Sequence, residues 1–274
     1  MAVTLADISR LRKMCGAGMM DCKSALEEAE NDFDKAMEII RKKGQAVAAK
    51  RSDRDASEGC VLAAENGDFA AIVAVKCETD FVAKNADFIA MTKGFLDLAL
   101  ANKPTSKEEA LAMALSDGRT VENHITDRIG VTGEKMEFGF YEFVNDASTI
   151  SYIHPGNKLA TIVAFNMPLE RQVARDVAMQ IAAMNPVSIT PADVTQKVID
   201  TEMEIARDKA RQAGKPENML DRIAQGALQK FFKENTLLQQ DFVKDSSMTI
   251  DQYLKKQDKD LTVTSFKRVT LNVD

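Results

Sequence analysis

Few side chains in this 274-residue chain are suited to catalysis or metal binding, and they are scattered. The histidines and cysteines are His124, His154, Cys15, Cys22, Cys60 and Cys77. The cysteines lack the CxxC spacing of metal sites and fit a reducing compartment. His154 lies in a predicted turn with Pro155 and Gly156 and could act as a base, but no nucleophile is spaced to accompany it. The sequence therefore predicts no metal site and no enzyme.

A glycine-rich segment at residues 16–24 suggests a phosphate-binding loop, but the pattern fails. Such a loop needs glycine directly before its lysine, where this chain has Cys22, and it needs a preceding strand where this segment follows a helical pattern. The dinucleotide fingerprint fails as well, because Asp21 holds its third glycine position. We therefore predict no cofactor. What remains is a glycine turn that presents Met19 and Met20, either to a small core or as adaptable contacts for a partner.

The segment at residues 77–84, Cys-Glu-Thr-Asp-Phe-Val-Ala-Lys, joins an apolar run to a segment with helical spacing that begins near Phe88. Connections of this kind lie on the surface and carry function more often than the elements they join. Asp80 and Phe81 fall at its tip. Spacing alone favours the plain interpretation, in which Phe81 is core and Asp80 caps a helix. The alternative is a binding tip, in which the ring fills a pocket on a partner.

Composition limits the classes of protein to which the chain can belong. Hydrophobic residues make up 45% and charged residues 28%, as in folded soluble proteins. The net charge of −6 argues against nucleic acid as a direct partner, because phosphate binding needs a basic face. No apolar run approaches the ~18 residues of a membrane span, and the N-terminus lacks a signal pattern. We therefore expect a cytoplasmic protein with no membrane contact.

Although the sequence lacks catalytic motifs, it predicts many helices and strands. The first predicted unit is a helical module with a linker, at residues 1–54. Apolar residues at helical spacing predict three short helices there. Asp32 caps the third helix, Gly44 ends it, and residues 45–58 form a linker. Three short helices enclose only a tiny core, so we expect the module to serve mainly for docking.

The remaining sequence predicts an α+β fold built from two related halves, at residues 55–146 and 147–274, each with a small antiparallel sheet. Asn66-Gly67 between apolar runs predicts a hairpin. The apolar run at residues 70–75 is echoed at 160–165, and each run follows a glycine-containing turn and precedes an amphipathic helix.

The second half carries an insertion at residues 191–232 that is almost entirely helix-forming. The sequence Ala-Gly-Lys-Pro at 213–216 breaks it, with glycine as a C-cap and proline near the start of the next helix. This pattern predicts an antiparallel coiled-coil hairpin. A final strand is expected over residues 261–273.

Three stretches, taken together and in order, resemble the bacterial elongation factor Ts family. They are residues 16–26, residues 77–85, and residues 213–245. The resemblance extends over nearly the whole chain. It implies a ubiquitin-associated-like three-helix module, a two-part α+β core and a coiled-coil hairpin. It also implies a guanine-nucleotide exchange factor that binds elongation factor Tu, both GDP-bound and nucleotide-free, and promotes GDP release so that GTP can bind.

The resemblance also assigns residues. The family's Thr-Asp-Phe-Val stretch displaces Mg²⁺ from the nucleotide site of the partner, and it corresponds here to Thr79, Asp80, Phe81 and Val82. The contacts of the N-terminal module with the GTPase domain, and of the hairpin-turn histidine with other domains, correspond to Arg12, Met19, Met20 and His154. The chain departs from the family where Cys15 stands in place of a frequent threonine.

An alternative of another class is an adaptor, in which the ubiquitin-associated-like module binds a helix of a partner without any effect on nucleotide. That interpretation predicts that residues 1–50 alone retain full affinity. An enzyme that uses His154 as a base would instead show a turnover sensitive to His154→Ala.

Overall fold

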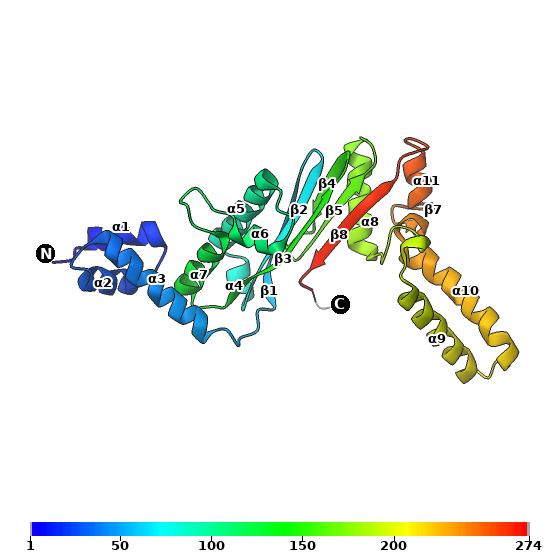
Figure 1. The fold of residues 1–274 in the computed structure, drawn as a ribbon, viewed down its shortest axis with the longest axis horizontal. Coiled ribbons are helices and arrows are strands. Elements are labelled where there is room, and N and C mark those ends of the chain that lie inside the picture. The colour runs from blue at the N-terminus through cyan, green and yellow to red at the C-terminus, as the bar shows by residue number, and fades with distance from the viewer. Residues whose placement is uncertain (1, 273–274) are drawn as a thin grey trace.

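The computed structural model describes residues 2–272. The molecule is elongated, with a helical module at the N-terminal end, two β-sheets with their covering helices in the centre, and a projecting pair of helices at the other end (Figure 1). Helices and small antiparallel sheets therefore confirm the predicted α+β class.

The N-terminal module comprises α1 (Leu5–Cys15), α2 (Met19–Glu28) and α3 (Phe33–Lys50). A capping box opens α1, since Thr4 and Asp7 each accept a hydrogen bond from the backbone N–H of the other. Gly16 ends it in the left-handed conformation, with φ of 71°. Leu11 and Leu26 are fully buried in the small core.

The prediction that Gly44 ends the third helix is wrong, because α3 continues to Lys50. Gly44 is buried against Gly130, so closely that a Cβ atom placed on Gly130 would lie 2.5 Å from the Cα atom of Gly44. The lack of a side chain at Gly44 and Gly130 therefore allows α3 and α7 to pack closely, and it does not end α3. The predicted linker over residues 45–58 is correspondingly short, since turns begin only at Arg51.

The first half of the core is an antiparallel sheet with the order β1-β2-β3 and four helices between the second and third strands. Its elements are β1 (Glu58–Asn66), β2 (Phe69–Cys77), α4 (Asp80–Ala83), α5 (Ala86–Asn102), α6 (Lys107–Ala112), α7 (Val121–Thr132) and β3 (Met136–Asn145). The predicted hairpin at Asn66-Gly67 is confirmed, with φ of 67° at Gly67.

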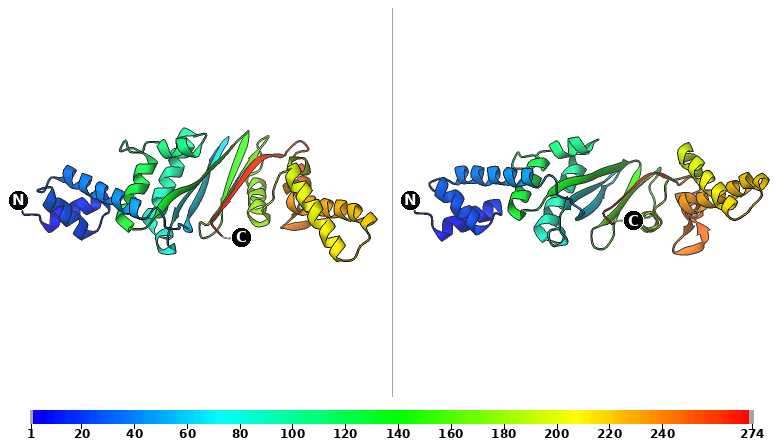
Figure 2. Two further views of the ribbon diagram at one scale, coloured as in Figure 1. Left: turned by 60° about the horizontal axis from the view of Figure 1, so that its bottom comes forward. Right: turned by 90° about the horizontal axis from the view of Figure 1, so that it is seen from below.

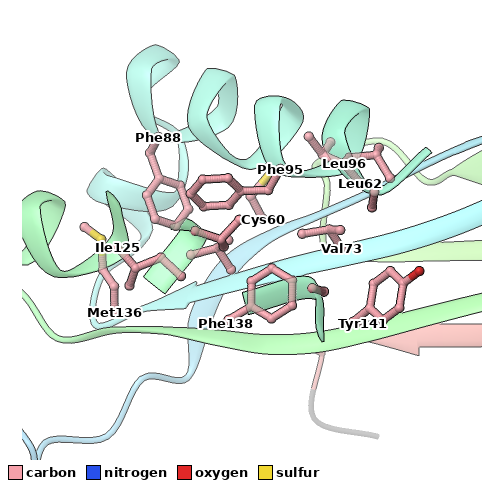
Figure 3. Close-up of a cluster of buried hydrophobic side chains, with 14 of the residues drawn as sticks. Cys60, Leu62, Val73, Phe88, Phe95, Leu96, Ile125, Met136, Phe138 and Tyr141 are labelled. Atoms are coloured by element: carbon pink, nitrogen blue, oxygen red, sulfur yellow. The ribbon is translucent and has the colours of Figure 1, made fainter. Parts of the chain in front are cut away.

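Several aromatic side chains lie in the interior of this half (Figure 3). Phe88 and Phe95 descend from α5 onto the sheet and are buried. The ring of Phe95 meets that of Phe138 on β3, with centroids 6.5 Å apart. This apolar contact fixes α5 on the sheet and so fixes the segment that leads into it.

The second half contains β4 (Ser148–Ile153), β5 (Leu159–Phe165), α8 (Arg171–Met184) and β8 (Val263–Thr270), with the strand order β4-β5-β8. The closing strand predicted at 261–273 is therefore present over 263–270, while residue 273 lies outside the described residues. The two sheets pack face to face, with helices covering their outer sides (Figure 2). Small and branched residues fill this contact, namely Val61, Ala63, Ala70, Ile72, Ala74, Val144, Ala160, Ile162, Ala164 and Val269.

The helical insertion projects from the second half (Figure 1). It consists of η1 (Pro191–Asp193), α9 (Gln196–Gln212) and α10 (Glu217–Asn235), and it is followed by η2 (Leu237–Gln239), β6 (Asp241–Phe242), β7 (Asp245–Thr249) and α11 (Ile250–Lys255). Gly214, with φ of 72°, turns the chain between the two long helices. Ala210, Leu220 and Ala224 are buried between them, so the predicted helical hairpin is present.

Candidate functional site

The segment between β2 and α5 forms a projecting tip, defined here as the α4 tip (residues 79–84). Thr79 caps α4, since its hydroxyl oxygen accepts from the backbone N–H of Val82 at 3.4 Å. The same hydroxyl donates to Glu134 at 2.6 Å, and the backbone N–H of Thr79 donates to the second carboxylate oxygen at 3.1 Å. A carboxylate just beyond the end of α7 therefore holds the start of α4 in place.

Phe81 is 85% exposed, so the plain interpretation that places this ring in the core is wrong. Its neighbours point the other way. Val82 is half-buried against the core of the first half, and Ala83 is buried there. The one turn of α4 thus anchors itself with one face and presents an aromatic ring with the other. An exposed ring on an anchored turn suits insertion into a partner.

Asp80 is also directed outward and forms an ion pair with Lys84, with Oδ2 and Nζ 2.6 Å apart. This hydrogen bond holds the pKa of Asp80 below its usual value, so the side chain is a carboxylate at neutral pH. The plain interpretation of Asp80 as the helix cap is wrong, because Thr79 fills that position.

Glu78 connects the α4 tip to the N-terminal module. Its carboxylate accepts from the backbone N–H of Lys135 at 2.6 Å and from Arg51, the C-cap of α3, at 3.0 and 3.1 Å. These bonds, the one from Lys135 first, hold the pKa of Glu78 below its usual value. The ammonium group of Lys135 in turn donates to the carbonyl oxygens of Ser52 and Arg54. The sequence analysis identified none of these supporting residues, because their spacing along the chain carries no local pattern.

The predicted contacts of the N-terminal module are accessible. Arg12 is exposed, and Met19 and Met20 are 45% and 71% exposed, so the alternative that places both methionines in the small core is wrong. A Cβ atom placed on Gly16 would lie 4.0 Å from Val131, in the last turn of α7. The loop that precedes the methionines therefore lies beside the same end of α7 from which Glu134 holds the α4 tip.

His154 is exposed in the turn between β4 and β5, with Nδ1 3.1 Å from the hydroxyl of Tyr152. This turn lies near the α4 tip, since Lys158 forms a 2.8 Å ion pair with Glu58 at the start of β1 and also lowers the pKa of Asp80. The imidazole thus shares one end of the two sheets with the tip.

The assembled residues present exposed side chains that are suited to contact with a partner. Within residues 2–272, no three His, Cys, Asp or Glu side chains converge as a cation site. In the same part of the chain, no helix is long and apolar enough to cross a bilayer. The exposed groups are a guanidinium on α1, two thioethers at the start of α2, an aromatic ring on α4 and an imidazole in the turn between β4 and β5.

Comparison with known proteins gives a consistent result. A family model described as "Elongation factor TS" matches residues 78–272. The chain is 70% identical to the elongation factor Ts of Porphyromonas gingivalis, and 56% identical to that of Azobacteroides pseudotrichonymphae, over the full length of both chains in each case. It is 50% identical to the elongation factor Ts of Christiangramia forsetii over 98% of each chain.

Proposed function

Because this chain belongs to the elongation factor Ts family and is a guanine-nucleotide exchange factor of translation elongation, we propose that it binds elongation factor Tu·GDP and inserts Phe81 into it. The observation that carries the proposal is the ring of Phe81, which is 85% exposed on a turn anchored by Thr79 and Glu134. The insertion displaces the groups that hold Mg²⁺ at the nucleotide, and GDP then leaves. The chain stays bound to the nucleotide-free partner until GTP enters.

The energy that the ring supplies covers only part of this task. Coupling between the two binding events is reciprocal. If this chain lowers the affinity of elongation factor Tu for GDP by a given ratio, GDP lowers the affinity of elongation factor Tu for this chain by the same ratio. A thousandfold weakening requires about 4 kcal/mol, whereas burying one phenylalanine ring contributes about 1.5–3 kcal/mol. The remainder must come from further contacts, for which Arg12, Met19, Met20 and His154 are exposed.

Asp80 has a secondary role in this mechanism. Mg²⁺ is held by oxygen ligands and keeps several waters, so a neighbouring carboxylate competes for the hydrogen bonds that order those waters. Asp80 is already ionised, and its ion-pair partner Lys84 is exposed, so the carboxylate can be released at little cost. Thr79 and Val82 act indirectly, by holding the turn. Loss of the cation leaves the charge of the phosphates uncompensated.

Other assignments belong to the same proposal. We infer that the N-terminal module is ubiquitin-associated-like, that the α9–α10 pair is a coiled coil, and that the units are residues 1–54, 55–146 and 147–274. The protein works in the cytoplasm and supplies no catalytic chemistry or cofactor of its own.

Stopped-flow release of a fluorescent GDP from elongation factor Tu, over a Mg²⁺ titration, tests the mechanism. Phe81→Ala should slow the stimulated release by about ten- to a hundredfold, the equivalent of the lost burial energy, and should leave the thermal unfolding temperature unchanged. Phe140→Ala on β3 is the matched control, since that ring is 41% exposed but lies on another element, and it should leave release unchanged. Binding without acceleration, or an unfolded Phe81→Ala variant, would contradict the insertion mechanism.

A further inference from the structure

The loop between α1 and α2 holds two thiols against each other. The sulfur atoms of Cys15 and Cys22 are 3.7 Å apart, and both cysteines are free. A single residue orients them, because the N–H of Ala17 donates to the Cys15 sulfur at 3.4 Å and its carbonyl oxygen accepts from the Cys22 thiol at 3.7 Å. The separation exceeds a disulfide bond, of roughly 2.05 Å, by less than about two ångströms.

The two thiols differ in access. Cys22 is fully buried, and burial raises the pKa of its thiol to about 12. Cys15 is only half-buried, and it lines a cavity of about 290 Å³ between the N-terminal module and α7 that is also bordered by Met14 and Val131. A small solute therefore reaches Cys15 first. The other cysteines, Cys60 and Cys77, are buried in strands of the first half.

We propose that Cys15 and Cys22 are a modification site, at which a small peroxide forms an intramolecular disulfide that changes the partner-binding loop. The Cys15 sulfur attacks the peroxide, the O–O bond breaks, and a sulfenic acid forms with release of water. The Cys22 sulfur then displaces the hydroxyl group as a second water, so that two thiols and one hydrogen peroxide give one disulfide and two waters. A thiol reductant reverses the reaction.

The disulfide encloses the residues proposed to touch the partner. The ring that it closes contains residues 16–21, and thus both Met19 and Met20. Closing the gap between the sulfur atoms draws the end of α1 and the start of α2 together, and the turn at Gly16 absorbs that movement. Because Met20 is 71% exposed in the first turn of α2, its position relative to α7 changes. The effect on binding rests on the proposed function, whereas the formation of the bond does not.

The bond is tested by mass spectrometry on the full-length protein. Cleavage by trypsin after Lys13 and Lys23 places both cysteines in one peptide, residues 14–23. After treatment with hydrogen peroxide, or with the thiol oxidant diamide, this peptide should lose the mass of two hydrogen atoms and should resist alkylation in denaturant. Cys15→Thr, which carries the residue frequent in the family, is the control in which Cys22 should remain fully alkylated. Two alkylated thiols in the oxidised native chain would overturn the proposal.

The consequence for binding is tested by calorimetric titration into nucleotide-free elongation factor Tu. The oxidised chain should bind about tenfold more weakly than the reduced chain, as expected when one well-packed side chain no longer reaches its pocket, and dithiothreitol should restore the affinity. Reversal by dithiothreitol excludes methionine sulfoxide at Met19 or Met20, which this reagent does not reduce. Equal affinities would overturn the effect on binding. A reduced chain that fails to bind would count against the proposed function alone, since the disulfide is read independently by mass.

Discussion

Each half of the core has a connection that leads from its central strand into a helix, and the two connections differ in their exposure to solvent. After β2 the chain forms the α4 tip, with Phe81 directed into solvent. After β5 it runs directly into α8, and the corresponding apolar residues, Met167 and Leu169, pack against the core of the second half. Asn166 fastens this second connection, with hydrogen bonds of 2.8 and 2.9 Å to the segment before β8. One copy of the repeat is available to a partner, and the other is committed to stability.

The interiors of the two halves differ in the same sense. The first half is packed with aromatic rings, whereas α8 in the second half buries polar groups. Asp176 accepts from Lys244 at 2.7 Å, from Tyr253 at 2.9 Å and from Gln172 at 2.7 Å. Gln180 bonds to the segment that follows the helical hairpin. Hydrogen bonds constrain the orientation of the groups they join more than apolar contacts do. Here they hold the segment that follows the helical hairpin against α8.

The substitution Asp176→Ala is expected to have the largest effect, and it should distinguish the stabilising role of the second half from the binding role proposed for the first. It removes three hydrogen bonds and leaves partly buried donors without an acceptor, which should lower the free energy of unfolding by about 3 kcal/mol. Urea denaturation measures the loss. Lys244→Ala is the control, since its side chain is 46% exposed, and it should cost less. GDP release per folded molecule should not change, and a slowed release would show that the second half contributes to the tip.

A smaller effect is expected where the N-terminal module meets the first half. Gly130→Ala places a methyl group against the backbone of Gly44, and it should weaken docking of α3 on α7 by about 2 kcal/mol. Amide hydrogen exchange along α3 should then accelerate. Gly94→Ala in α5 is the matched control, because its new Cβ atom meets no other atom within 4 Å. That variant should gain about 0.5–1 kcal/mol from helix propensity. If amide hydrogen exchange along α3 were unchanged in Gly130→Ala, the contact between α3 and α7 would not be closely packed.

A still smaller loss of stability is expected when Thr79, which supports the α4 tip, is substituted. Thr79→Ala removes the helix cap and the hydroxyl bond to Glu134, at a cost of about 1 kcal/mol. We expect partial disorder of Phe81 and a several-fold slower GDP release, with little change in unfolding temperature. Thr79→Ser, which keeps the hydroxyl, should restore release. If both variants behave alike, the cap does not position the ring.

The mildest test is acidification. Burial opposes ionisation of Asp176, but hydrogen bonds from Lys244, Tyr253 and Gln172 outweigh it and keep its pKa below the usual value. A depressed folded pKa means that this stabilisation is present above the unfolded pKa, of about 3.9, and is lost as the pH falls through the folded value. Thermal unfolding between about pH 6 and pH 3 should therefore show a loss of stability that is smaller in Asp176→Asn. An identical pH profile in both chains would exclude Asp176 as the source.

The sequence predicted the elements well wherever a local pattern decides the structure. Gly67 and Gly156 mark the two hairpins because their conformations suit tight turns, and the repeat of apolar runs located the two sheets. Thr79 and Glu134, by contrast, are separated by fifty-five positions and meet only in the folded chain. A pairing of this kind leaves no signal in a single sequence.

Two residues show why local rules failed. Gly44 has the identity of a helix stop, yet its lack of a side chain serves the contact with Gly130, which tertiary packing alone reveals. Phe81 follows a strand, as core residues do, and its spacing favoured burial. Its place at the tip of a surface connection offered exposure as the alternative, and the family resemblance favoured that alternative. In the proposed mechanism, the free energy that rewards an exposed ring is gained in the complex. Cys15 and Cys22 escaped notice because their spacing matches no redox motif.

The face-to-face packing of the two sheets gives the centre of this molecule the mechanical character of a stiff beam. Its contact is filled by small and branched side chains, and close-packed interiors compress little and transmit displacement. The α4 tip stands at one end of this beam, where it contacts β1, β2 and α5. When a stiff body presses on a softer one, most of the deformation occurs in the softer body. In the proposed mechanism, the GTPase is then the partner that changes shape, and the shape of its nucleotide site is the property that exchange must alter.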